Sequence, residues 1–598
     1  MQRLVVSVEP VLASIAAYSI LSKVATIKRY DRMNTLVLAL AASFYIVSLL
    51  ACGIEMYALP GRIFPKSAVV SAHPLASKVG ADIMRKGGNA ADAAVAVHFA
   101  LAVVYPNAGN LGGGGFFLWR SFNGAAKACD FRETAPASAT RDMFLDSAGM
   151  PVTKLSLAGH RACGVPGSVA GMWEVHKTLG RLRWQECLQP AIDLASKGFR
   201  ITTKQAADLN KHRAELIQWN KEGCALVRLR PWRPGMKLVQ TELAQTLRRI
   251  QVNGRDGFYK GRTAELLVQE MQRGSGIITS KDLETYVPVW RQVVRGRFRQ
   301  YDILSMPPPS SGGIALLQLL TMWEQQTTRG IPNIHSADHV HLMAECERRV
   351  FADRAEWMGD PDFVRVPAAS LLDTTYLRNR MNSYSPDTAT PSSVVHAGAI
   401  TQLKEHDQTT HFSIVDSFGN AVAQTTTLND SYGNKVMVRG AGFLLNNEMD
   451  DFSVKPGVPN MYGLVGSHAN AIAAGKRMLS SMTPTIVENN GSLRFVVGTP
   501  GGSTIITSVF QTIVNVVDYG MTMQQSVNTA RFHHQWLPDR ITIENRCLRS
   551  NVRAELKYRG HTLITKDAIG RVDAIERDTD GRLHTGADPR GDDTADGF

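Results

Sequence analysis

The sequence predicts a globular chain in which helices and strands are mixed. Glycine is plentiful, with 50 residues among 598, and Asp, Asn and Pro separate short apolar runs along the whole length. Hydrophobic side chains make up 44% of the composition, enough for several cores or for one large intertwined domain. A fibrous or disordered chain would not combine these features.

The first expected element is a membrane or targeting segment. Residues 36–54 form a run of 19 without a charge, and basic residues precede it at Lys23, Lys28, Arg29 and Arg32. This pattern favours a membrane segment or signal sequence at 34–56 over a buried core helix, with 1–33 as a cytosolic or targeting segment. Residues 49–52 resemble a bacterial lipoprotein cleavage box, although Leu50 fits poorly. The N-terminal segment could therefore be cleaved, lipidated at Cys52 or retained.

A strand and two helices are expected after a linker. Residues 67–70 predict the strand, and the helix that follows has apolar residues on one face at Leu75, Val79, Ile83 and Met84. Gly87 and Gly88 end this helix. Ala-rich residues 89–104 predict a second helix, and the four glycines at 112–115 indicate close backbone approach. They do not predict a phosphate loop, because its Lys-Ser/Thr ending is missing.

A hairpin is expected in the second half of the chain. Residues 381–408 are rich in Ser, Thr, Pro and Asn and predict a surface segment. Strands are predicted at 411–415 and 421–428, joined by a turn at 416–420. A turn centred near Phe418 and Gly419 places residue 428, give or take one, opposite Thr409. Thr427 is therefore expected close to Thr409.

A strand, a glycine pair and a helix follow nearer the C-terminus. Residues 493–498 predict a strand, and an apolar helix begins at about Ser503, after Gly501 and Gly502. Backbone N–H groups at the start of a helix are preorganised donors for a negative charge. The same glycines also fit a tight turn.

Charge and cysteine content exclude several classes of function. The formal net charge is +13, but Lys and Arg are dispersed and no nucleic-acid-binding motif is present. The seven cysteines are scattered, with no CxxC pair and no His at metal-ligand spacing. We therefore expect no metal, no cofactor and no nucleic-acid partner, while one or two disulfides remain possible outside the cytosol.

Thr409 is a candidate nucleophile only if the chain is cut before it. A Thr hydroxyl needs a neighbouring base, and a Thr at a chain terminus can use its own α-amine. The pKa of an α-amine, roughly 7.7–8.0, suits that role. Thr409 is internal, so this chemistry requires cleavage between Gln408 and Thr409.

Several motifs in order along the chain resemble those of the γ-glutamyltransferases. The segment around the cut, HDQTTHFS at 406–413, resembles their processing site. Further motifs are NAGNLGGGG at 107–115, DFRE at 130–133, GVPGS at 164–168, PPSSGG at 308–313, LLNNEMDDF at 444–452, SSM at 480–482 and GTPGGS at 498–503. The resemblance covers nearly all of the chain after the membrane segment.

The resemblance implies a fold and an assembly. The family has an α+β, four-layer αββα N-terminal-nucleophile hydrolase fold, with both subunits made from one autocleaved precursor. The large subunit is then expected at 66–408 and the small catalytic subunit at 409–598, which is 598 − 408 = 190 residues.

The resemblance also assigns the site. Thr409 is the nucleophile, Thr427 bonds to it, and Gly501 and Gly502 form the oxyanion hole. The substrate's α-carboxylate is held by a bidentate Arg and two hydroxyl donors, which are Arg132, Ser480 and Ser481. Its α-ammonium is accepted by Asn429, Glu448 and Asp451.

A lid loop and a location complete the expectations. Residues 455–463 resemble the lid of many bacterial members, with Tyr462 as its gate. The expected partners are glutathione and other γ-glutamyl donors, amino acid or dipeptide acceptors, and a membrane through the N-terminal segment. A periplasmic or extracellular enzyme fits these features.

Two alternatives stay open. One is an amidase of the same fold that takes glutaryl groups, such as a cephalosporin acylase. Asp451 argues against it, because a glutaryl group has no ammonium to neutralise a buried carboxylate. The other is an inactive cell-surface homologue, and the intact set of site residues argues against that.

Overall fold

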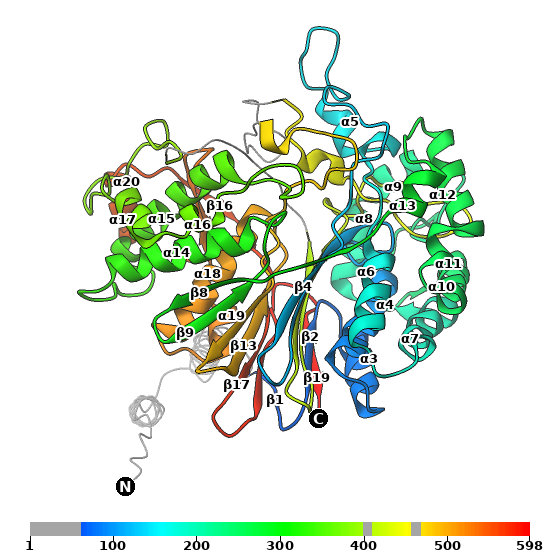
Figure 1. Cartoon of the computed structure of the whole chain (residues 1–598), viewed down its shortest axis with the longest axis horizontal. Coiled ribbons are helices and arrows are strands. Elements are labelled where there is room, and N and C mark those ends of the chain that lie inside the picture. Colours follow the sequence, from blue (N-terminus) through cyan, green and yellow to red (C-terminus); the bar gives the residue numbers. More distant parts are fainter. Residues whose placement is uncertain (1–60, 399–408, 456–467) are drawn as a thin grey trace, which may run out of the picture. The chain divides into compact units, whose positions relative to one another are not determined.

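Two seven-stranded sheets lie face to face at the centre of the computed structural model, with helices on both outer sides (Figure 1). The structure describes residues 61–398, 409–455 and 468–598. This arrangement is the four-layer αββα fold predicted from the sequence. No helix in the described ranges is long and apolar enough to cross a membrane, and the predicted membrane segment at 34–56 lies outside them.

Each sheet combines strands from distant parts of the chain. In order, the first contains β1 (Ile63–Phe64), β18 (Leu583–Gly586), β17 (Asp573–Arg577), β13 (Ser492–Gly498), β12 (Thr485–Asn489), β9 (Tyr301–Ser305) and β8 (Val294–Phe298). The second contains β19 (Thr594–Gly597), β2 (Ala68–Ser71), β10 (Thr410–Val415), β11 (Ala421–Thr427), β3 (Gly114–Arg120), β4 (Ala126–Asp130) and β7 (Val289–Arg291). Strands from before and after residue 408 are therefore neighbours in both sheets.

Two small sheets lie outside this sandwich. One contains β14 (Phe532–His533), β15 (Ile541–Glu544) and β16 (Leu563–Lys566), and the other β5 (Phe199–Arg200) and β6 (Lys237–Leu238).

The helices divide between the two outer layers (Figure 1). Those on the side of the second sheet are α3 (Pro74–Arg85), α4 (Ala90–Val104), α6 (Ser168–Leu179), α7 (Trp184–Lys197), α8 (Thr203–Lys211), α9 (Arg213–Trp219), α10 (Thr241–Asn253), α11 (Asp256–Tyr259), α12 (Gly261–Arg273) and α13 (Ser280–Thr285). Those on the other side are α14 (Gly312–Gln326), α15 (Ala337–Trp357), α16 (Ala368–Leu371), α17 (Thr374–Arg380), α18 (Ser503–Val517), α19 (Met523–Asn528) and α20 (Ser550–Tyr558). The short helices α5 (Thr153–Leu157), η1 (His160–Ala162), η2 (Glu448–Asp451) and η3 (His468–Asn470) complete the set.

Strand alternation explains the layers. Val69 on β2 and Phe117 on β3 face the core under α4, whereas their neighbours Val70 and Phe116 face the core between the two sheets. Successive side chains of a strand point to opposite faces, so a strand buried on both faces is apolar throughout. The sandwich is thus covered on both sides.

Local signals place the two helices that follow β2 and the helix that follows β13. Pro74 opens α3, and the Asn89 side chain caps α4 in a capping box with Asp92. All residues of α4 are buried, as its small side chains predict. The predicted helix after Gly502 is confirmed as α18.

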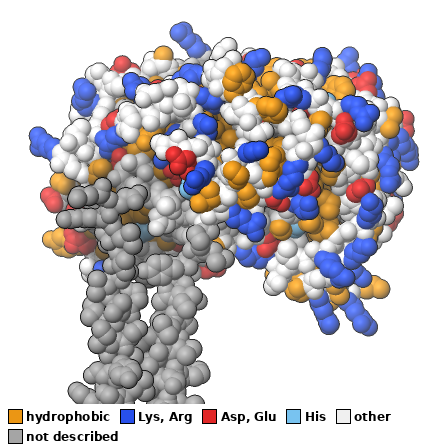
Figure 2. Space-filling view, turned by 90° about the horizontal axis from the view of Figure 1, so that it is seen from below, with side chains coloured by type: hydrophobic (Ala, Val, Ile, Leu, Met, Phe, Trp, Pro, Cys, Tyr) orange, Lys and Arg blue, Asp and Glu red, His pale blue; other side chains and the backbone are white. Residues whose placement is uncertain are grey.

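Surface charge is dispersed on the face shown in Figure 2. Lys and Arg side chains there lie among hydrophobic and uncharged ones rather than in one continuous block.

Candidate active site

Thr409 lies at one end of the second sheet, next to Thr427. Thr410 pairs with Thr426, and Val415 with Ala421, so continuing the register places Thr409 opposite Thr427. The turn is centred on Phe418. The prediction placed residue 428, give or take one, opposite Thr409, and the observed partner position is 427. Thr409 is 6% exposed, and the Thr427 hydroxyl accepts a hydrogen bond from the Asn429 N–H at 2.7 Å.

The glycine run brings several backbones together at this end of the sheet. A Cβ at Gly113 would lie 2.0 Å from the Thr427 carbonyl oxygen, and one at Gly114 would lie 2.5 Å from the Glu133 carboxylate. Real Cβ atoms do not come so close to other atoms. The expected close approach is confirmed, and it joins β3 to both the hairpin and the segment around Arg132.

The end of β13 from the first sheet meets the hairpin at the same place. The buried His411 ring lies against Gly498, where a Cβ would be 2.3 Å from the ring. His411 Nδ1 lies 2.9 Å from the Thr425 hydroxyl oxygen, and Nε2 lies 3.1 Å from that of Ser413. Burial lowers the pKa of His411 to about 3, so the ring is neutral. It sets the spacing between the strand after Thr409 and the strand before Gly501.

Gly501 and Gly502 adopt backbone angles that only glycine accepts readily. Their φ values are 130° and 61°, and Gly502 is the N-cap of α18. The first N–H groups of a helix have no partner within it and attract negative charge. This geometry matches a preorganised donor site for an oxyanion.

Arg132 lies at the centre of a buried cluster of acids. Its Nη1 is 2.6 Å from the Glu448 carboxylate and 3.6 Å from Glu133, and its Nη2 bonds Asp451. The four side chains are between 0 and 3% exposed. Three carboxyls thus surround one guanidinium.

The electrostatics of this cluster follow from burial. Desolvation raises the pKa of Glu133 to about 8 and also raises those of Glu448 and Asp451, while Arg132 acts in the opposite direction. Three carboxyls against one guanidinium can therefore accept a further positive charge when they are ionised.

Backbone contacts connect the cluster to the threonines. The Asn447 N–H donates to the Leu428 carbonyl at 3.1 Å, and Asn429 Nδ2 donates to the Asn447 carbonyl at 3.0 Å. Glu448 follows Asn447 directly in the chain. Asn429 has a φ of 72°, in the left-handed region that Asn tolerates.

Comparison with known proteins decides the family. Residues 76–598 match the family described as Gamma-glutamyltranspeptidase. Glutathione hydrolase proenzymes of Escherichia coli (strain K12) and Pseudomonas aeruginosa are each 46% identical, the first over 87% of this chain and 90% of its own length, the second over 88% and 93%. The chain belongs to the gamma-glutamyltranspeptidase family.

The fold comparison agrees. A cephalosporin acylase from Bacillus halodurans superposes with a TM-score of 0.79 at 25% identity, covering 91% of this chain and 98% of that one. The fold is therefore shared by transpeptidases and acylases, so the choice between them depends on the site.

Ser481 lies against a second arginine that sequence reasoning missed, and the Ser311 hydroxyl beside this arginine donates to the Ser480 carbonyl. Arg354 on α15 is buried and donates from Nη2 to the Ser481 hydroxyl at 2.9 Å and from Nε to Ser311 at 2.8 Å. Burial raises the pKa of Asp451, and the charges of Arg132 and Arg354 oppose that rise. Arg354 is a further positive charge close to the place assigned to the substrate carboxylate.

Two predicted residues cannot be placed. Gln408 and Tyr462, the cleavage residue and the lid residue, lie outside the described ranges. The remaining predicted residues all lie in the described ranges: Thr409, Thr427, Asn429, Arg132, Glu448, Asp451, Ser480, Ser481, Gly501 and Gly502.

One buried group of metal-ligand type lies away from this site. His341, Glu345 and His561 have potential ligand atoms within 4.8 Å of one another. The Glu345 carboxylate is bound by Arg348 and Arg349, and the two rings bond each other at 2.7 Å. Two neighbouring guanidinium groups oppose a cation there.

Proposed function

We propose that this family member cuts itself between Gln408 and Thr409 and then transfers γ-glutamyl groups to water or to amino acid and dipeptide acceptors. One observation carries the proposal, which is that the nucleophile and a buried charged cluster lie at the same end of the sandwich. Thr409 lies beside Thr427, and the cluster consists of Arg132, Glu448 and Asp451. Asn429 and Asn447 join the two. Glutathione is the donor named for the curated relatives.

Maturation needs no other protein, only the Thr409 hydroxyl and water. The Thr409 hydroxyl attacks the Gln408 carbonyl carbon, the peptide nitrogen leaves as the Thr409 amine, and an ester remains. Water hydrolyses this ester, which releases the Gln408 carboxylate and a new N-terminal Thr409.

Turnover uses the same hydroxyl. The free α-amine of Thr409 takes the hydroxyl proton, the oxygen attacks the γ-carbonyl, and the donor's amine leaves with a proton. Gly501 and Gly502 hold the oxyanion. Water or an acceptor amine then attacks the ester carbonyl, the bond to Thr409 Oγ breaks, and the hydroxyl regains its proton.

When the glutamyl head binds, Arg132 exchanges its ion pairs with Glu448 and Asp451 for one with the substrate. The substrate's α-carboxylate accepts hydrogen bonds from the Arg132 guanidinium, Ser480 and Ser481. Its α-ammonium donates to Glu448, Asp451 and Asn429. Both charges of the head find opposite charges in a dry pocket, so neither is left uncompensated.

The acid-rich cluster favours this activity over glutaryl amidase activity. A glutaryl donor brings a carboxylate but no ammonium. Its carboxylate would pair with Arg132, and Glu448 and Asp451 would then lose their ion-pair partner without gaining another.

The chain is proposed to act outside the cytosol. The uncharged run at 36–54 and the basic residues before it support export, with the N-terminal segment retained as a membrane tether or removed. The catalytic part would then be periplasmic or extracellular.

A donor panel tests the function. Initial rates with donor and acceptor varied should give parallel lines, and mass spectrometry should find a γ-glutamyl ester on the Thr409 peptide. Intersecting lines and no adduct would refute the covalent scheme. Preference for a glutaryl amide over its γ-glutamyl counterpart would support the acylase alternative instead.

A further inference from the structure

Two buried arginines contact the same short segment, residues 478–482. Arg132 donates from Nη2 to the Leu479 carbonyl at 3.2 Å. Arg354 donates from its own Nη2 to the Ser481 hydroxyl at 2.9 Å. Each arginine is 1% exposed, and a guanidinium keeps its charge inside a protein. The segment that carries the serines assigned to the substrate carboxylate therefore contacts two positive charges, of which only Arg132 has so far been given a part in binding.

Arg354 holds two hydroxyl groups with one guanidinium. Its Nε donates to the Ser311 hydroxyl at 2.8 Å, while Nη2 donates to that of Ser481. Ser311 is itself bonded to the segment, because its N–H and its hydroxyl both donate to the Ser480 carbonyl, at 2.7 and 2.8 Å. The donors of a planar guanidinium have fixed directions. The two hydroxyl oxygens are therefore held in set positions relative to α15.

The same bonds restrict where each hydroxyl proton points. A serine hydroxyl has one proton to donate and two lone pairs. Because an oxygen that accepts from Arg354 cannot also donate to it, the proton is turned away from the guanidinium. Ser311 gives its proton to the Ser480 carbonyl. Ser481 likewise directs its proton away from Arg354, in the segment that Arg132 also contacts.

We propose that Arg354 is a positioning residue for recognition of the donor's α-carboxylate, and that it acts by orienting the Ser481 hydroxyl to donate to that carboxylate. The inference rests on the γ-glutamyl transfer set out above. Without Arg354 the hydroxyl can rotate, and ordering it then opposes binding. Arg354 takes no part in forming the nucleophile or the oxyanion donors. Its loss should therefore weaken binding of a head that carries an α-carboxylate and leave the chemical step at Thr409 intact.

Kinetics with two donors test this role in the matured, full-length enzyme. γ-Glutamyl-p-nitroanilide carries the α-carboxylate, whereas 4-aminobutyryl-p-nitroanilide has the same ammonium and anilide without it. In Arg354→Met we expect KM for the first donor to rise about tenfold with kcat within about threefold of wild type, since a hydrogen bond to a charged group is worth roughly tenfold or more. For the second donor, measured at high enzyme concentration, kcat/KM should stay within about threefold of wild type.

A double-mutant cycle tests whether Arg354 acts through Ser481. Ser481→Ala alone should also raise KM for γ-glutamyl-p-nitroanilide. Adding Arg354→Met to Ser481→Ala should raise KM by less than about threefold more, because the hydroxyl that Arg354 orients is already gone. A rise in the double variant equal to the product of the two single rises would show that the arginine and the serine act independently, and this would overturn the proposal.

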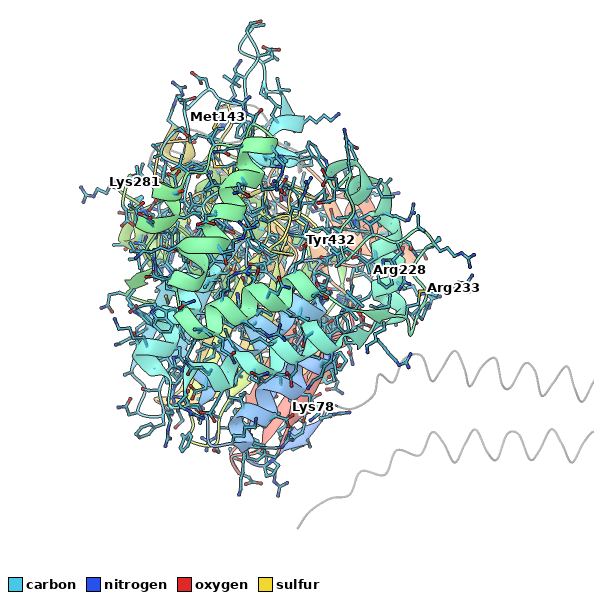
Figure 3. The ribbon with its side chains drawn as sticks, turned by 90° about the vertical axis from the view of Figure 1, so that its right-hand side faces the viewer. Lys78, Met143, Arg228, Arg233, Lys281 and Tyr432 are labelled. Carbon is cyan, nitrogen blue, oxygen red and sulfur yellow. The ribbon has the colours of Figure 1, made fainter. Side chains whose placement is uncertain are left out.

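Two variants control for the effects of burial and charge. Arg120→Met removes a guanidinium that is 2% exposed and pairs with Glu488 at 2.7 Å, at the end of β3 away from Gly114. Lys281→Met removes one exposed positive charge, on a side chain that Figure 3 shows pointing away from the molecule. Arg120→Met should lower the melting temperature, and neither variant should change KM for either donor.

Arg354→Lys covers the case in which Arg354→Met yields no matured enzyme. A lysine at this position keeps the positive charge but loses the rigid fork that holds both hydroxyls. We expect KM for γ-glutamyl-p-nitroanilide to rise at least about threefold, again with little change in kcat.

The outcomes keep this inference apart from the proposed function. If the wild-type enzyme hydrolyses no γ-glutamyl donor, the proposed function fails. If it does, and the Arg354 variants keep the wild-type KM, the role of Arg354 is overturned. A fall in kcat at unchanged KM, or an equal loss of kcat/KM with both donors, would also overturn it, because the effect would then lie at Thr409 and not at the α-carboxylate.

Discussion

Arg132 has one set of partners in the structure and another in the proposed complex. In the structure its guanidinium pairs with Glu448 and Asp451. A zwitterionic glutamyl head can replace these contacts one for one, because its carboxylate takes the guanidinium while its ammonium takes the acids. A zwitterion therefore leaves the net buried charge unchanged, which limits the desolvation cost of selecting an amino acid head.

This exchange gives a prediction for Arg132. Arg132→Lys keeps the positive charge but loses the bidentate fork, so the variant should mature normally while kcat/KM for γ-glutamyl donors falls about 100-fold. Arg132→Ala leaves the acids without a cation and should also lower the melting temperature, since breaking a buried pair costs about 3–5 kcal/mol. Steady-state kinetics and thermal unfolding separate the two effects. Near-wild-type kcat/KM in Arg132→Lys would show that the carboxylate binds elsewhere.

The titrating groups predict the pH dependence of activity. The Thr409 amine must be neutral to accept a proton, so kcat should rise through its pKa, normally about 7.7–8.0. Asp451 and Glu448 must be ionised to take the ammonium, and burial raises their pKa values. Their binding contribution is present above the raised pKa and is lost as pH falls through it, so kcat/KM should fall on the acid side more steeply than kcat. A kcat that stays flat across this range would exclude the amine as the base.

At the scale of elements, the contact between β10 and β13 fixes the site. His411 on β10 lies against Gly498 at the end of β13, three residues before Gly501. Any shift of one strand against the other moves the nucleophile relative to the oxyanion donors. A 1 Å misplacement of catalytic groups can cost about 100-fold in rate.

A double-mutant cycle tests this contact. Gly498→Ala should destabilise the protein by about 1–3 kcal/mol through overpacking, and it should lower kcat. His411→Ala should also be harmful, because it leaves a void between the sheets. In the double variant, the losses of stability and of kcat should be smaller than the sums of those in the single variants. The alanine at position 411 makes room for the methyl group added at position 498. Additive losses in thermal unfolding and kcat would argue against the contact.

The sequence predicted the strands around Thr409, but it did not predict that Arg354 would be buried beside the glutamyl pocket. The hairpin prediction succeeded because strand alternation and a polar turn restrict the register to within one residue. Arg354 was missed because α15 carries Glu345, Glu347, Arg348, Arg349 and Asp353 nearby, a pattern typical of a solvated helix. The structure buries all of them. Which charges meet inside the protein depends on packing between distant segments, and local spacing does not encode that.

The whole molecule explains how a cut chain stays together. β2, from before residue 408, pairs with β10 and β19 from after it, and β12 pairs with β9 in the other sheet. Cleavage at 408/409 breaks one peptide bond next to β10 and removes none of these strand pairs. The buried cores also combine residues from both parts.

We therefore expect the cleaved enzyme to behave as one particle. Denaturing electrophoresis should show two fragments, the smaller of 598 − 408 = 190 residues, while size exclusion without denaturant gives a single peak containing both. Thr409→Ala lacks the attacking hydroxyl, so it should remain one chain, yet elute at the same volume with the same circular dichroism, because the fold precedes the cut. Separation of the wild-type fragments in native buffer would contradict the interleaved sheets. Two normal fragments from Thr409→Ala would contradict self-cleavage by this hydroxyl.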